Sequence, residues 1–172
     1  MRIQRCTAVL FGAALALPAL IGTAGADPVA GGCYGGQLTT TNVPGTGSVG
    51  MDTNVTGGLT DCASPQLPGV TGGMLNIRYP FNVATGSNSG TGAGGNPANG
   101  TIAWSDGSVS VVSGNWVTSP VGQNAISTLG IQSGPGAGQQ LVLGTRQIAN
   151  AGSVGGGSGG AGSVMIIDVL FR

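Results

Sequence analysis

The sequence predicts an all-β fold, a small antiparallel β-sandwich or barrel of about eight strands held by one disulfide. Several stretches alternate apolar and polar residues with a period of two, which is typical of half-buried strands. Glycine and proline, 36 and 9 of the 172 residues, punctuate these stretches and leave no segment with a convincing helical period. Two cysteines follow the N-terminal leader, an even number that suits an oxidising compartment.

The first 26 residues have the features of a secretory signal peptide. Arg2 and Arg5 precede an apolar run over residues 7–21, and Ala24-Gly25-Ala26 forms a small-x-small cleavage site. We expect cleavage after Ala26, which leaves residues 27–172 as a single secreted β domain, extracellular or associated with the cell envelope. An uncleaved anchor is the alternative, and the glycine and proline inside the apolar run disfavour it. We expect no membrane span after cleavage, because no later segment is long and apolar enough for a spanning helix.

The alternating stretches predict the strands in chain order. The strongest runs over Leu75–Val83, where Pro80 indicates an edge or a bulge. Two segments around residues 133–138 predict a hairpin with a longer loop. Glycine-rich loops are expected over 84–99 and 150–162. The other predicted strands are Gln37–Thr41, Val49–Val55, a short one at Trp116–Val117, Ala125–Gln132, Gln139–Ile148 and Ser163–Phe171.

The stretch GTIAWSDGSVSVV, residues 100–112, predicts a tight hairpin. Asp106-Gly107 suits a two-residue type I′ turn, which needs positive φ at both central positions. That turn would place Trp104 opposite Val109 and Ile102 opposite Val111, with all four side chains on one face. We therefore expect the indole of Trp104 in the core.

The last strand is apolar on both faces, which predicts a central strand covered on both sides. In this alternation Val164, Ile166 and Leu170 face one side. Asp168 is the one carboxylate in the strand. Because an unpaired buried charge is costly, we expect it to meet Arg78 or Arg146, or backbone donors.

Cys33 and Cys62 are expected to form a disulfide. In the chain-entropy description, closing a loop of this length stabilises the fold by roughly 3–4 kcal/mol. The alternative is a lipid on Cys33, but the three residues before it lack the apolar residue of a bacterial lipobox.

The hairpin motif resembles one found in small, uncharacterised secreted β-proteins of actinobacteria, with the pattern G-T-I-x-W-x-(D/N)-G-x-S. These proteins tend to pair a cysteine just after the signal with a second about thirty residues later. The resemblance implies an extracellular all-β protein and no specific activity. The residues that carry it are Cys33, Cys62, Gly100, Thr101, Ile102, Trp104, Asp106, Gly107 and Ser108.

The chain contains no histidine, lysine or glutamate, which removes most catalytic and metal-binding arrangements. Ser158 has nucleophile-elbow spacing but no base to activate it. Segments 45–50 and 157–162 have dinucleotide-binding spacing without the strand-to-helix context. Residues 52–58 resemble the start of a calcium loop, to which Asp61 could add a ligand, but no bidentate glutamate follows. We therefore expect no cofactor and no metal.

Residues 27–172 contain five aspartates and three arginines, so the sequence predicts no basic patch. Nucleic acid is therefore not an expected partner. We expect a secreted, non-enzymatic β domain with a binding or structural role. A cell-wall glycan or a surface protein is the candidate partner. The first alternative is a carbohydrate-binding module that uses Trp104, Trp116 and Tyr79 as an exposed platform. The others are a small hydrolase using aspartates and an outer-membrane barrel, for which six aromatic residues make poor girdles.

Overall fold

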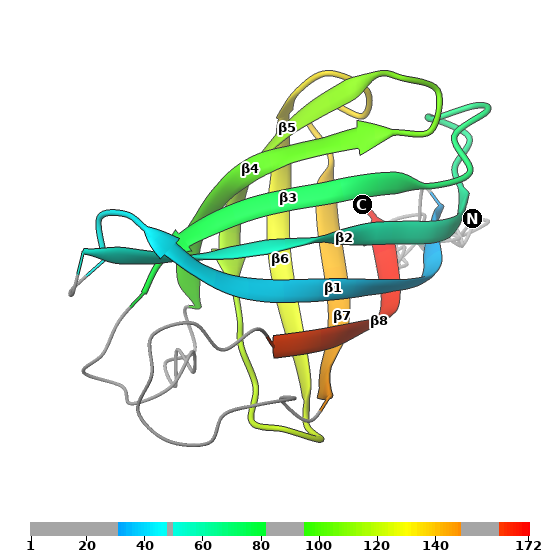
Figure 1. The fold of residues 1–172 in the computed structure, drawn as a ribbon. Coiled ribbons are helices and arrows are strands. Elements are labelled where there is room, and N and C mark those ends of the chain that lie inside the picture. The colour runs from blue at the N-terminus through cyan, green and yellow to red at the C-terminus, as the bar shows by residue number, and fades with distance from the viewer. Residues whose placement is uncertain (1–30, 48–49, 82–94, 149–161) are drawn as a thin grey trace, which may run out of the picture.

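The computed structural model describes residues 31–47, 50–81, 95–148 and 162–172 (Figure 1). The expected signal peptide and Ser158 lie outside these residues. Within them the chain forms eight antiparallel strands and no helix. The strands are β1 (Gly32–Pro44), β2 (Met51–Ala63), β3 (Gly73–Pro80), β4 (Asn96–Trp104), β5 (Val109–Trp116), β6 (Asn124–Ser133), β7 (Gln140–Ile148) and β8 (Gly162–Phe171).

The eight strands form a closed barrel. Each strand pairs with the next, and β8 returns to pair with β1, for example Leu38 with Val164. The prediction of an all-β fold with about eight strands is confirmed, in its barrel form. In Figure 1, β1, β2 and β3 cross in front of β6 and β7 at a steep angle. A closed barrel of this kind and a sandwich of two crossed sheets both consist of antiparallel strands with one inward face. The alternating sequence pattern is therefore compatible with either architecture.

The interior is filled by one inward-facing row of side chains from each strand. An eight-stranded barrel is just wide enough for side chains to fill it. The predicted alternation is confirmed over residues 75–79. Pro80 is the last residue of β3, so the edge or bulge expected there is wrong, and Val83 lies outside the described residues. Trp116 ends the long strand β5 and does not form a separate short strand. The largest fully buried side chains are Trp116, Tyr79, Phe171, Leu38, Leu75, Ile77, Ile102, Leu129, Leu141, Leu143, Val55 and Val112.

Glycine lets neighbouring strands approach closely in the middle of the barrel wall. A Cβ at Gly100 would collide with the carbonyl oxygen of Asn76, and a Cβ at Gly114 with that of Thr128. Such positions mark tight bends of coiled strands. Part of the high glycine content therefore serves the curvature that closes the barrel.

Cys33 and Cys62 lie directly opposite each other on β1 and β2 and form the predicted disulfide, with a Cα–Cα distance of 3.9 Å. The sulfur of Cys33 is therefore not available for a lipid. The disulfide lies at the end of the barrel that we call the base, where β1, β3, β5 and β7 begin. Leu67 and Val70, from the connection between β2 and β3, are buried at the same end.

The predicted register of the Trp104 hairpin is wrong by one residue. Ala103 pairs with Val109, so Trp104 lies opposite Ser108. Val109 and Val111, which were expected in the core, are 50% and 43% exposed on the outer face. Ser110 and Val112 take the inward positions instead.

The loop contains three residues, which explains the shift. The amide of Gly107 donates to the carbonyl of Trp104 at 3.0 Å, and the amide of Trp104 donates to the carbonyl of Ser108 at 2.8 Å. Gly107 alone has a positive φ, +86°. Asp106 stays at negative φ and accepts the Ser108 amide through Oδ1 at 2.9 Å. This is a type I turn followed by a glycine bulge, the usual form of a three-residue hairpin loop.

The core position of Trp104 is confirmed, since its side chain is 3% exposed. Its ring packs against Phe171 with a centroid distance of 6.0 Å. The indole Nε1 donates to Ser110 Oγ at 2.8 Å, and that hydroxyl donates to the Pro135 carbonyl at 2.7 Å. The corrected register supplies this partner, because it turns Ser110 inward beneath the indole.

The prediction that β8 is covered on both faces is wrong. Met165 and Ile167 are each 42% exposed, because a single-layer barrel leaves its outer face open. The pairing with β7 shifts between Gly144 and Thr145, which makes Ile167 the extra residue of a bulge. Beyond it Val169 and Phe171 point inward, while Leu170 points away from the core.

We expect Trp104→Ala to lower the free energy of unfolding by about 3–5 kcal/mol, the usual loss for a buried large aromatic residue. Asp106→Asn is the matched control, because asparagine can accept the same Ser108 amide. Its effect should stay within about 0.5 kcal/mol. Urea unfolding followed by tryptophan fluorescence measures both variants. An unchanged midpoint for Trp104→Ala would contradict the packing described above.

Candidate functional site

The end opposite the base, which we call the mouth, is lined by hydroxyl groups. Here β1, β3, β5 and β7 end, at the lower left of Figure 1. In five strands an inward-facing aliphatic residue is followed, two residues nearer the mouth, by a hydroxylic one. These pairs are Leu38 and Thr40, Val55 and Thr53, Ile77 and Tyr79, Leu129 and Ser127, and Leu143 and Thr145, all buried. The period of two places each pair on one inward row.

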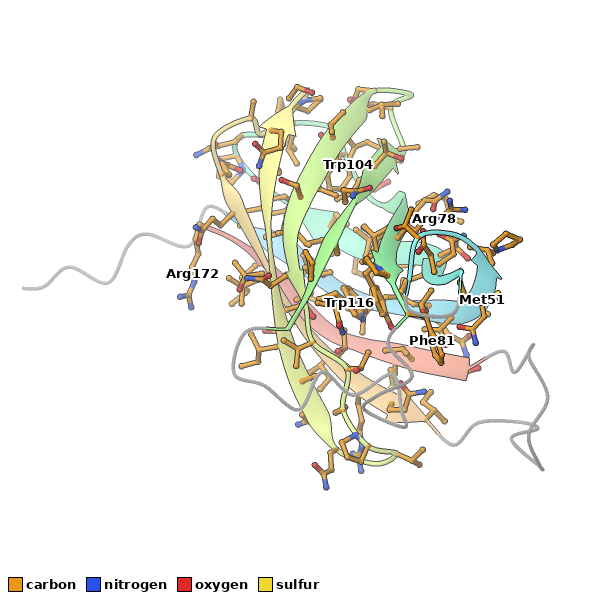
Figure 2. All side chains as sticks on the ribbon, turned by 90° about the vertical axis from the view of Figure 1, so that its left-hand side faces the viewer. Met51, Arg78, Phe81, Trp104, Trp116 and Arg172 are labelled. Atoms are coloured by element: carbon orange, nitrogen blue, oxygen red, sulfur yellow. A yellow bond between two sulfur atoms is a disulfide. The ribbon has the colours of Figure 1, made fainter. Side chains whose placement is uncertain are left out.

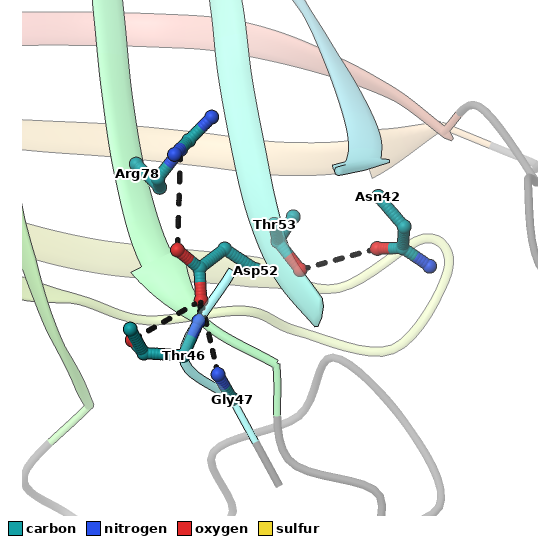
Figure 3. Close-up of polar contacts among 6 residues, drawn as sticks. All are labelled: Asn42, Thr46, Gly47, Asp52, Thr53 and Arg78. Atoms are coloured by element: carbon teal, nitrogen blue, oxygen red, sulfur yellow. Dashed lines mark hydrogen bonds and ion pairs between the residues drawn. The ribbon is translucent and has the colours of Figure 1, made fainter. Parts of the chain in front are cut away.

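Two of these hydroxyls have partners within the wall. Thr53 Oγ1 donates to Asn42 Oδ1 at 3.3 Å, which joins β2 to β1 (Figure 3). Ser127 Oγ accepts the amide of Val117 at 2.9 Å and lies 3.4 Å from its carbonyl oxygen. The second pair ties the segment after β5 to β6, so it fixes the rim of the mouth.

Two other hydroxyls at the mouth are buried without a hydrogen bond of regular geometry. Tyr79 is 2% exposed, and its phenolic oxygen makes no hydrogen bond of regular geometry. Thr118 Oγ1 is likewise buried and unpaired. An unsatisfied buried hydroxyl costs about 1–3 kcal/mol, so native structures hold few of them. Both groups line the same pocket.

This pocket has a cavity volume of about 10 Å³, close to what one water molecule requires. Figure 2 views the molecule from the left of Figure 1 and shows Trp116 within the ring of strands, with Met51 and Phe81 near its rim. Hydroxyl, amide and apolar groups share the lining, and none of its side chains is charged. The lining residues are Thr40, Tyr79, Trp116, Val117, Thr118, Ser119, Thr145, Gln147 and Val164.

Burial raises the pKa of the Tyr79 phenol to about 12, and the neighbouring Thr53 hydroxyl opposes this rise. The cause is desolvation, since the phenolate would lose its hydration inside the barrel. The phenol therefore remains a neutral hydrogen-bond donor throughout the neutral and mildly alkaline range.

Asp52 organises the turn between β1 and β2. Its Oδ1 accepts the amide of Thr46 at 2.8 Å and that of Gly47 at 3.1 Å, and its Oδ2 lies 4.0 Å from Arg78 Nε (Figure 3). The calcium-loop interpretation of residues 52–58 is wrong, because this segment is part of strand β2. Within the described ranges, no three histidine, cysteine or acidic side chains gather closely enough to hold a metal ion.

The other described carboxylates lie apart from the mouth pocket. Asp106 is exposed in its turn, where the hydroxyl and then the amide of Ser108 lower its pKa. Asp61 is exposed on β2 with a φ of +53°. Asp168 is half-buried at the β8 bulge beside Gly144. Among the described residues the one ion pair is that of Arg78 with Asp52, so Asp168 pairs with neither Arg78 nor Arg146. Backbone donors to Asp168, the other expected partner, stay a prediction.

The three aromatic candidates are all buried, so they form no exposed platform. Tyr79 and Trp116 come together in the mouth pocket, whereas Trp104 packs at the base against Phe171. Sequence reasoning missed Thr118 and the other hydroxyls of the mouth. The available signal was the replacement of an aliphatic residue by a hydroxylic one at the end of several inward rows.

Comparisons with protein-family models, with curated proteins and with solved structures find no match to this chain. Among the described residues, no helix is long and apolar enough to cross a membrane.

The raised pKa of Tyr79 predicts a loss of stability in alkali. The folded protein keeps the phenolic proton up to about pH 12, whereas the unfolded chain releases it near pH 10. This contribution is full below pH 10 and is lost as the pH rises toward 12, by about 2–3 kcal/mol in total. Urea unfolding at pH 9 and pH 11.5 measures it.

Tyr79→Phe should remove most of this loss of stability at high pH. Tyr34→Phe is the control, because Tyr34 is exposed at the base, and this variant should show the same loss as the unsubstituted protein. Equal pH dependence in both variants would mean that Tyr79 is not the group responsible.

Proposed function

We propose that this protein is a secreted, non-enzymatic β-barrel domain that binds a small ligand at its mouth. The observation that carries the proposal is the pair of buried, unpaired hydroxyls of Tyr79 and Thr118 on one pocket. Barrel mouths are frequent ligand sites, and a few convergent polar groups in an otherwise apolar lining are typical of them. The mouth of the barrel thus brings desolvated hydrogen-bonding groups together in one pocket.

An extracellular location is supported by two features. The N-terminal residues have the pattern of a signal peptide, and the disulfide between Cys33 and Cys62 suits an oxidising compartment. The resemblance of the Trp104 hairpin to secreted actinobacterial proteins points the same way. The domain would then act outside the cell or within its envelope.

A binding role is favoured over hydrolysis by the placement of the carboxylates. Asp52 is engaged by two backbone amides, and Asp106 caps an exposed turn. Neither lies on the mouth pocket, and the sequence has no histidine, lysine or glutamate to act with an aspartate. A purely structural role is the second candidate, and the dense packing of the remaining interior favours it.

The expected partner remains a cell-wall glycan or a surface protein, but the mode of contact changes. A stacking platform of Trp104, Trp116 and Tyr79 is not available to a glycan, since all three are buried. A ligand group would instead enter the mouth and reach the unpaired hydroxyls.

The indole N–H groups of the two tryptophans test this proposal, since one lies at each end of the barrel. A panel of small neutral, anionic, cationic and apolar compounds would be titrated into labelled protein and followed by nuclear magnetic resonance. We expect at least one compound class to shift the Trp116 signal saturably while the Trp104 signal stays in place. If no class moves Trp116, the binding role fails and the structural role replaces it.

A further inference from the structure

We infer that the mouth pocket recognises a hydroxyl group of a neutral polyol or sugar, which enters the barrel end-on between Tyr79 and Thr118. This inference rests on the proposed binding function and names its ligand class. Three independent properties of the pocket lead to it: its hydrogen-bonding groups, its charge and its size.

The hydrogen-bonding groups call for a partner that both donates and accepts. A phenol and an aliphatic hydroxyl each offer one O–H and two lone pairs. A ligand hydroxyl can accept from one of them and donate to the other. A carbonyl can only accept and an ammonium group can only donate, so each leaves part of this buried capacity unmatched.

The absence of charge from the lining selects a neutral ligand. The nearby carboxylate of Asp52 is directed at the amides of Thr46 and Gly47, and the guanidinium of Arg78 lies on its other oxygen (Figure 3). Neither residue lines the pocket. A buried ion without a counter-charge is strongly disfavoured, so carboxylates, phosphates and ammonium groups do not suit this site.

The size of the pocket selects a terminal group and not a whole molecule. A cavity of about 10 Å³ admits a group the size of a water molecule, and a hydroxyl is such a group. Displacing an ordered water costs little when the entering group reproduces its hydrogen bonds. Trp116, Val117 and Val164 give the pocket apolar walls, which suit the C–H groups beside a sugar or polyol hydroxyl.

Two variants and two matched controls test the assignment. Tyr79→Phe and Thr118→Val each remove one unpaired hydroxyl with little change of shape, so both should fold. Tyr34→Phe and Thr101→Val make the same chemical changes at exposed positions, the first at the base and the second on the outer face of β4. Unfolding midpoints would confirm that all four proteins are folded.

The probes are glycerol and glucose, with acetone as an acceptor-only probe and acetate and methylammonium as charged probes. We expect glycerol and glucose to shift the Trp116 indole signal saturably and leave Trp104 unchanged. The concentration for half-saturation should rise at least tenfold in Tyr79→Phe and Thr118→Val and stay unchanged in the two controls. For acetone, acetate and methylammonium, the concentration at half-saturation should be at least tenfold higher than for glycerol.

The outcomes separate this inference from the function on which it rests. If acetone or a charged probe saturates the Trp116 shift at least as readily as glycerol, the pocket binds ligands but the polyol assignment is wrong. If glycerol and glucose bind equally well to both mouth variants, the two hydroxyls are not the recognition groups. If none of the five probes moves Trp116, the polyol assignment falls, and the binding function falls with it if the apolar compounds of the panel also leave Trp116 unchanged.

Discussion

The pairing of β8 with β1 is the constraint on which the rest of the structure depends. It turns eight strands into a closed surface without an exposed edge, and it fixes the interior at a width that side chains can fill. Closure in turn demands bends, and Gly100 and Gly114 provide them where the strands come too close for a Cβ. It also accounts for the bulge in β8, which restores inward packing at Val169 and Phe171 before the chain ends.

The closed barrel has two ends, and the side chains that line them differ in polarity. At the base, apolar side chains of the β2–β3 connection fill the opening, and the indole of Trp104 finds a hydroxyl partner in Ser110. Near the mouth, five of the inward rows carry a hydroxylic residue, and two hydroxyl groups make no regular hydrogen bond. Between the two ends the interior is filled by apolar side chains.

Much of the fold could be predicted from local pattern. Alternation located most of the strands, and the even cysteine count identified the disulfide. The register of the Trp104 hairpin could not be predicted with the same rule, because Asp-Gly fits both a two-residue turn and the end of a three-residue turn with a bulge. Closure depends on the pairing of the first and last strands, which no local pattern contains. The mouth was missed for the same reason, since its hydroxyls come from five strands and meet only when the barrel closes.

The two unpaired hydroxyls lower the free energy of unfolding of the barrel. A phenylalanine at position 79 and a valine at position 118 would keep nearly the same shape and remove a cost of about 1–3 kcal/mol each. That cost is a large part of the roughly 5–15 kcal/mol by which a domain of this size is stable. Trp104 at the base and Ser127 and Thr53 at the mouth all have hydrogen-bond partners. The one other buried side-chain atom without a partner among the described residues is the amide oxygen Oε1 of Gln139, beside β7 at the base. Where a protein departs from its own packing rule, the departure usually marks a site of function. At the mouth, two buried hydroxyl groups without a regular hydrogen bond line one pocket. This coincidence favours a ligand-binding site over an accidental packing defect.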